Sequence, residues 1–122
     1  MSVPEDEPGG GKPDGGGEEE VGERAAGEGP RAILAVRWTL RGRVQGVGFR
    51  YFTRGLAREL GLAGRVRNLH TGHVEIEAAG EPESVEELRR QVHRGPPGAR
   101  VVELREEILP AGTGWESFEI DR

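Results

Sequence analysis

The stretch that most constrains how this chain can fold is Gly42–Arg50, which reads Gly-Arg-Val-Gln-Gly-Val-Gly-Phe-Arg. It joins a segment with strand-like alternation to a segment with helical periodicity, and three of its first seven residues are glycine. Glycine adopts positive φ angles at little cost and leaves backbone amides open to a ligand. A helix that begins at about Phe49 would direct unpaired N–H groups, the positive end of its dipole and Arg50 at one point. The stretch therefore predicts a strand, a loop and a helix that together bind an anion such as phosphate.

The segments on either side of this loop have clear and different periods. Apolar and other residues alternate from Ile33 to Arg41, which predicts a half-buried strand. After the loop, an apolar stripe at spacings of three, four and four predicts a helix that ends at Gly61 in a left-handed cap; the stripe is Phe49, Phe52, Leu56 and Leu60. Gly55 inside this helix costs about 1 kcal/mol relative to alanine, so we expect close packing there.

A β-hairpin is predicted next. Gly64–Leu69 and His73–Ala79 are two strand candidates, and Gly72 between them can supply a positive φ. His70 and His73 flank this turn and allow two interpretations, a solvated turn or part of a metal site. We favour the turn, because no acidic or thiol partner stands at ligand spacing.

A second helix and two further strands complete the pattern. The break at Gly80–Pro82 precedes a helix in which Ser84 and Glu87 have the spacing of a capping box. Its apolar stripe is Val85, Leu88 and Val92, and it is ended by the sequence Gly95-Pro96-Pro97-Gly98. Val101–Leu109 alternates as a strand, and Phe118–Ile120 is a short final strand.

The order of these elements predicts the fold class. Strand, helix, strand, strand, helix and strand, followed by a short C-terminal strand, indicate an α+β protein with a ferredoxin-like α/β plait. Both helices should cover one face of a mainly antiparallel sheet. We assign this domain to residues 31–122.

Composition separates residues 1–30 from the rest. They hold nine Gly and four Pro, with nine acidic residues against Lys12 and Arg24, whereas the remaining 92 residues hold 15 Arg and 13 acidic residues. Such a segment cannot bury enough apolar surface to offset its ordering entropy, so residues 1–30 are predicted to be a disordered acidic tail. It is either an interaction tail or a solvated extension without a specific role. The nearly neutral domain lacks the basic surplus of a dedicated nucleic-acid-binding protein.

Several classes of chemistry and location are disfavoured. The chain has no cysteine, so a disulfide framework, a thiolate metal site and a thiolate nucleophile are all absent. No apolar run approaches membrane-spanning length, and the N-terminus lacks the features of a secretory signal. We therefore expect a cytoplasmic protein with no membrane partner.

Two motifs and the C-terminal strand resemble one family, the acylphosphatases. Gly42–Arg50 closely resembles their phosphate-binding signature. Gly64-Arg65-Val66-Arg67-Asn68, with a hairpin containing Gly72 after it, resembles their Gly-Trp-Val-(Arg/Lys)-Asn segment, and Asn68 stands at the expected interval of 18 positions after Arg50. Phe118-Glu119-Ile120 resembles their C-terminal strand. The resemblance covers about residues 34 to 122.

The resemblance implies an enzyme and a set of roles. An acylphosphatase hydrolyses the carboxyl–phosphate bond of an acyl phosphate to a carboxylate and inorganic phosphate. In that family the arginine at the position of Arg50 and the loop amides hold phosphate, while the asparagine at the position of Asn68 orients the attacking water. The implied phosphate-binding loop comprises Arg43, Val44, Gln45, Gly46, Val47, Gly48 and Phe49. No metal or other cofactor is implied, the phosphate itself takes the proton of the water, and we expect a monomer with a small-molecule substrate and no nucleic acid.

Two departures and two alternatives remain. Arg65 replaces the family's usual tryptophan, and Asp121 stands where a basic or polar residue is common. The alternative to an enzyme is a non-catalytic phosphate- or RNA-binding ferredoxin-like module. The same plait occurs in RNA-binding domains, although only Trp38 is available before the loop to stack on a base. The chain also resembles the accessory domain at the start of hydrogenase-maturation carbamoyltransferases, but we favour a stand-alone protein. Five arginines near the loop form either a steering patch for anions or a solvated sheet edge; they are Arg37, Arg41, Arg43, Arg65 and Arg67.

Overall fold

The computed structural model describes residues 32–112 and 114–121, so the tail predicted for residues 1–30 lies outside the described residues. In chain order the elements are β2 (Leu34–Arg43), α2 (Phe49–Glu59), β3 (Ala63–Asn68), β4 (Val74–Gly80), α3 (Pro82–Arg94), β5 (Arg100–Leu109) and β6 (Phe118–Ile120). These bounds agree with the predicted elements to within two residues at most ends. No helix in the described ranges is long and apolar enough to cross a membrane.

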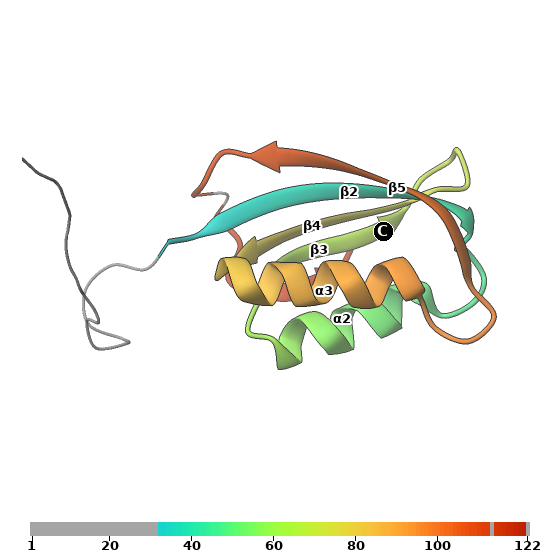
Figure 1. Ribbon diagram of the computed structural model, residues 1–122, viewed down its shortest axis with the longest axis horizontal. Coiled ribbons are helices and arrows are strands. Elements are labelled where there is room, and N and C mark those ends of the chain that lie inside the picture. Colours follow the sequence, from blue (N-terminus) through green and yellow to red (C-terminus); the bar gives the residue numbers. More distant parts are fainter. Residues whose placement is uncertain (1–31, 113, 122) are drawn as a thin grey trace, which may run out of the picture. The chain divides into compact units, whose positions relative to one another are not determined.

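The strands form one five-stranded sheet in the order β5-β2-β4-β3-β6. The pairs β2–β4, β2–β5 and β3–β4 are antiparallel, and β3–β6 is parallel. Figure 1 shows α2 and α3 side by side on one face of this sheet. The predicted ferredoxin-like plait, with a short extra strand at one edge, is confirmed.

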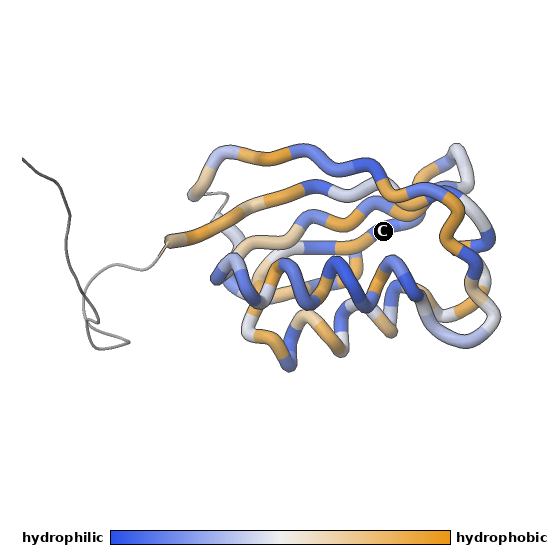
Figure 2. Tube along the Cα trace, in the orientation of Figure 1, coloured by the Kyte–Doolittle hydropathy of each residue, from blue (hydrophilic) through white to orange (hydrophobic). Residues whose placement is uncertain are grey.

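The core lies between the sheet and the two helices. Apolar and polar residues alternate along the central strands (Figure 2), so each strand turns one apolar row toward the helices. The sheet contributes side chains that are at most 1% exposed, including Val36, Trp38, Leu40, Val66, Val74 and Ile76. Because Trp38 is fully buried in this core, it is not available to stack on a nucleic-acid base.

The helices agree with one expectation and depart from two. Gly61 has φ 73° and ends α2 as predicted, with Leu62 N–H donating to Ala57 O at 2.9 Å. The expected capping box in α3 is wrong: the helix begins at Pro82, which makes Ser84 its third residue. The close packing expected at Gly55 is also wrong, because a Cβ there would meet no atom within 4 Å.

The pairing of β5 with β2 shifts next to the loop. Leu40 pairs with Leu104 and Arg41 with Glu103, but Gly42 pairs with Val101, so Val102 is left without a partner in the register. Val102 is 50% exposed, whereas Val101 packs against the core. This β-bulge turns Val101 rather than Val102 toward the core, whereas Leu104 beyond the bulge packs against the core as simple alternation predicts.

The open face of the sheet, meaning the face that the helices leave uncovered, carries charged side chains in cross-strand rows. One row runs Glu107, Arg37, Glu77, Arg65 in the strand register. Glu77 is 3% exposed and accepts hydrogen bonds from Arg37 Nε at 2.7 Å and Arg65 Nε at 2.8 Å. Burial acts to raise the pKa of Glu77, but the hydrogen bonds from Arg37 and Arg65 outweigh it and hold the pKa below its usual range.

The two departures from the family pattern contact each other. Arg65 Nη1 donates a hydrogen bond of 3.1 Å to Asp121 Oδ2 while its Nε donates to Glu77. The carboxylate of Asp121, just beyond β6, therefore balances the charge of Arg65. Arg67 likewise pairs with Glu75 at 2.9 Å. Most of the arginines expected to form a steering patch are thus neutralised by neighbouring carboxylates.

Candidate phosphate-binding site

The loop between β2 and α2 comprises Val44–Gly48 and is held by apolar side chains. Val44 before the turn and Phe49 after it are 1% and 2% exposed, and Val47 packs partly against the core. The side chains of Val44 and Phe49 therefore anchor the loop, and only their backbone groups are available to a ligand. Gly46 and Gly48 both have φ 78°, in the left-handed region where other residues are strained. These angles let the chain turn sharply from strand to helix.

The first turn of α2 presents the features expected of an anion site. Gly48 is the N-cap, Phe49 and Arg50 are the first two helical residues, and Phe52 N–H donates to Gly48 O at 3.0 Å. The N–H groups that precede Phe52 in the helix have no intrahelical acceptor, and the helix dipole is positive at this end. The first turn contains no acidic residue. No carboxylate of this turn therefore competes with a bound anion.

The strand register brings Asn68 to the same end of the sheet as the loop. Leu40 near the end of β2 pairs with Val74 at the start of β4, and Val74 pairs with Asn68 at the end of β3. Asn68 is exposed. The carboxyl ends of β2 and β3 thus lie on either side of β4 at the same end of the sheet, although Leu40 and Asn68 are 28 positions apart in the chain.

Gln45 ties the loop to the hairpin that follows Asn68. Its Nε2 donates to Leu69 O and to His73 O, each at 2.9 Å. The hairpin itself is closed by Leu69 N–H donating to His73 O at 2.9 Å, with Gly72 at φ 94° as predicted. One side-chain amide therefore fixes the loop relative to both strands of the hairpin.

Arg50 in α2 and Asn68 at the end of β3 lack the side-chain partners that most charged residues of the sheet have. Within residues 32–112 and 114–121, neither the Arg50 guanidinium nor the Asn68 side-chain amide has a hydrogen-bond or ion-pair partner. Arg50 is partly buried. By contrast, the paired arginines of the open face donate hydrogen bonds to carboxylates. A planar guanidinium with free donors beside a helix N-terminus can bind two oxygens of one phosphate.

Arg43 has a neighbour that sequence reasoning missed. Arg43 is the last residue of β2 and pairs in the register with Arg100, the first residue of β5. Both side chains are exposed, and neither has a hydrogen bond or ion pair within the described part of the chain. Only the β2–β5 pairing, with its bulge, places Arg100 beside the loop. The sequence offered no signal for it beyond a basic residue at the start of a strand.

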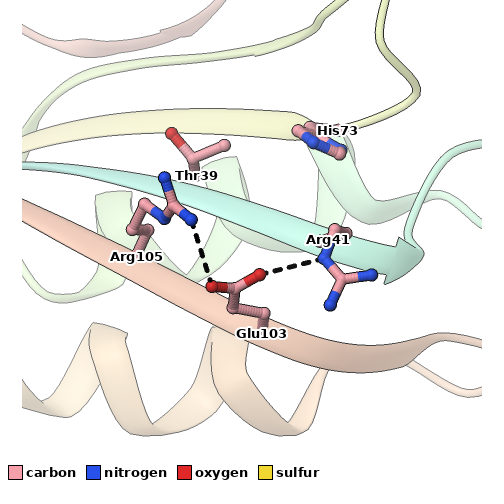
Figure 3. Close-up of a pocket in the computed structure, with 5 residues that line it drawn as sticks. All are labelled: Thr39, Arg41, His73, Glu103 and Arg105. Carbon is pink, nitrogen blue, oxygen red and sulfur yellow. Dashed lines mark hydrogen bonds and ion pairs between the residues drawn. The ribbon is translucent and has the colours of Figure 1, made fainter.

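A hollow opens on the open face next to the loop (Figure 3). It has a volume of about 250 Å³ and is bounded by Thr39, Arg41, His73, Glu103 and Arg105. Glu103 lies between the two arginines and accepts hydrogen bonds from Arg41 Nε at 2.9 Å and from Arg105 Nη2 at 3.5 Å. We call this feature the open-face hollow. No three His, Asp or Glu side chains of the described residues are placed to hold a metal ion.

Comparison with known proteins gives a consistent result. The sequence model of the acylphosphatase family matches residues 36–120. An acylphosphatase from Rubrobacter xylanophilus is 50% identical over 93 residues, which are 76% of this chain and 84% of that protein. The crystal structure of acylphosphatase from Bacillus subtilis matches with a TM-score of 0.71 at 36% identity, over 73% of this chain and 99% of that one. HypF from T. kodakarensis matches with a TM-score of 0.66 at 30% identity, but over only 12% of its length and 73% of this chain.

Proposed function

The chain belongs to the acylphosphatase family and is an acylphosphatase, and from this premise we propose how its own residues carry out the hydrolysis of an acyl phosphate. Arg50 and the backbone amides of the loop bind the phosphate, Asn68 orients the attacking water, and the products are a carboxylate and inorganic phosphate. The observation that carries this proposal is that Arg50 has no partner among residues 32–112 and 114–121 and lies in the first turn of α2, beside a glycine loop tied to the Asn68 hairpin.

Phosphate binding follows from donors that are fixed before the substrate arrives. The N–H groups at the start of α2 and the planar guanidinium of Arg50 supply several hydrogen bonds to the equatorial oxygens of the phosphoryl group. A hydrogen bond to a charged group contributes about 1.5 to 3 kcal/mol. Charge that shifts onto these oxygens during the reaction is stabilised by the same donors without reorganisation.

Asn68 is the residue to which we assign the orientation of the attacking water. A side-chain amide offers both a donor and an acceptor, so it can hold a water with one lone pair directed at phosphorus. The two hydrogen bonds of Gln45 support this role, because they limit the movement of the hairpin relative to the loop. Orientation of this kind lowers the barrier by removing rotational freedom in advance.

The leaving group needs little help from the protein. A carboxylate is a stabilised anion, so the bond to phosphorus can break without a general acid. No titratable side chain of the protein is assigned as the general base; the phosphate itself accepts the proton of the water. Neither step calls for a metal or other cofactor, and we propose that the substrate is a small molecule and the enzyme a monomer.

The test is release of phosphate from benzoyl phosphate by the purified protein in excess EDTA. Arg50→Ala and Asn68→Ala should each lower the rate by about 10²- to 10³-fold. Asn68→Ala should act mainly on kcat, whereas Arg50→Ala should also raise KM.

Arg50→Lys is the matched control, because it keeps the charge but loses the planar fork; it should lie between wild type and Arg50→Ala. Circular dichroism establishes that each variant is folded. A folded wild type that releases no phosphate, or variants with undiminished rates, would contradict the proposal.

A further inference from the structure

The open-face hollow lies close to the start of the phosphate-binding loop. Arg41, which lines it, stands three residues before Val44 on the same chain. A strand advances about 3.3 Å per residue, so about 10 Å separates the hollow from the loop. His73 lines the hollow as well, and its carbonyl oxygen accepts a hydrogen bond from Gln45 of the loop. The hollow and the loop are therefore parts of one end of the sheet.

The charge around the hollow is unbalanced. Arg41 and Arg105 share the single carboxylate of Glu103, and their side chains are 56% and 78% exposed. The hydrogen bond from Arg41, and then the charge of Arg105, hold the pKa of Glu103 below its usual range, so this carboxylate stays ionised near neutral pH. Even with Glu103 ionised, the hollow keeps one positive charge in excess and the hydroxyl of Thr39 at its edge (Figure 3).

Arg43 and Arg100 extend this positive charge to the loop. They lie opposite each other in the β2–β5 register, where side-chain Cβ atoms are about 4.5 to 5.5 Å apart. Like charges in this position are destabilising, and other arginines of the same sheet pair with acidic residues instead. A bound anion between Arg43 and Arg100 would relieve the repulsion.

We propose that the open-face hollow and the Arg43–Arg100 pair form a subsite for a second anionic group, carried by the acyl half of the substrate. This inference rests on the proposed function, because the loop must hold the phosphoryl group for the acyl group to reach the subsite. The enzyme then prefers acyl phosphates whose acyl group carries a carboxylate or a further phosphate. Glu103 limits the affinity of the subsite, since it occupies donors of Arg41 and Arg105.

A matched pair of substrates tests the preference. Benzoyl phosphate and 4-carboxybenzoyl phosphate share one ring and differ by one carboxylate, so the ratio of their kcat/KM values reports the subsite. In low salt, Arg100→Gln should lower the ratio of carboxylated to plain substrate about tenfold, and Glu103→Gln should raise it several-fold. Because the groups are exposed, 0.5 M salt should reduce both effects.

Arg90→Gln is the control for the loss of one positive charge. Arg90 is exposed on α3 and pairs with Glu86 and Glu87, and its replacement should leave the ratio unchanged. A ratio that does not change in Arg100→Gln and Glu103→Gln, while wild type hydrolyses both substrates, overturns the subsite and leaves the proposed function intact. Absence of hydrolysis of both substrates contradicts the proposed function.

A binding measurement gives a second readout that needs no turnover. Calorimetry with phenacylphosphonate and (4-carboxyphenacyl)phosphonate, in which a methylene replaces the bridging oxygen, compares the same two shapes as stable ligands. Wild type should bind the carboxylated phosphonate about tenfold more tightly, and Arg100→Gln should remove most of that difference. Equal affinities of wild type for the two phosphonates would overturn the subsite whatever the hydrolysis assay shows.

Discussion

Replacement of Gly55 by alanine should stabilise the protein. Gly55 lies in the interior of α2 and is exposed, and its backbone is helical. A Cβ built at this position meets no atom within 4 Å, so alanine fits without displacing a neighbour. The glycine therefore gives up backbone entropy on folding without any packing in return.

The size of the effect follows from helix propensity and from the size of the domain. Glycine in a helix interior is about 0.8 to 1.0 kcal/mol less favourable than alanine. For a domain of 60 to 100 residues, 1 kcal/mol corresponds to a shift in Tm of about 4 to 8 °C. Gly55→Ala should therefore raise the free energy of unfolding by about 1 kcal/mol and Tm by several degrees. Urea denaturation and calorimetry measure the two quantities.

Gly61→Ala is the matched control. A Cβ at Gly61 also meets no atom within 4 Å, but φ is 73° because this residue forms the left-handed end of α2. Alanine there should lower the free energy of unfolding by about 1 kcal/mol. The two substitutions thus have opposite signs although both sites are equally open. A loss of stability in Gly55→Ala, or a gain in Gly61→Ala, would refute the reasoning.

Three further outcomes are expected. The pKa of Glu77 is lowered in the folded protein, so the stability that its carboxylate contributes is present above its ordinary pKa of 4.5 and is lost as pH falls through the lower folded pKa. In urea denaturation from pH 7 to pH 3, the free energy of unfolding should therefore fall less in Glu77→Gln than in wild type. Gly42→Ala should cost more than 2 kcal/mol or displace β5, because its Cβ would overlap the carbonyl oxygen of Arg100; unchanged stability and amide shifts would contradict this. Gln45→Ala removes two hydrogen bonds of the loop and should cost about 1 to 3 kcal/mol and lower kcat, whereas an unchanged kcat would show that the tether is not needed.

Local patterns were sufficient for the elements and for the family. Alternation in β2, the apolar stripe of α3 and the turn at Gly72 each follow from the geometry of a few neighbouring residues, and the structure confirms them. The prediction of the stripe in α2 was less complete. Phe52, Leu56 and Leu60 are only partly buried, and the residues that are fully buried behind Phe49 are the small Thr53 and Ala57. Hydropathy alone underrates small residues at a close contact.

One error was local, and one relationship was missed because the partner lies far along the chain. The capping box at Ser84 was displaced because Pro82 can begin a helix at its first position. Arg65 and Asp121 were separate departures from a pattern in the sequence, whereas in the structure they form one ion pair. No local signal connects positions 56 residues apart.

The sequence by itself determined the elements, the fold class and the candidate loop with Arg50, because periodicity, glycine spacing and motif are properties of short segments. Only the tertiary structure decided which polar groups remain free. Pairing across the sheet neutralises Arg37, Arg65 and Arg67, and it leaves Arg50 and Asn68 without protein partners among the described residues. The bulge between β2 and β5 brings Arg100 opposite Arg43. The physical reason is that a charged side chain is neutralised by an opposite charge close to it in space, and the strand register decides which side chains are close.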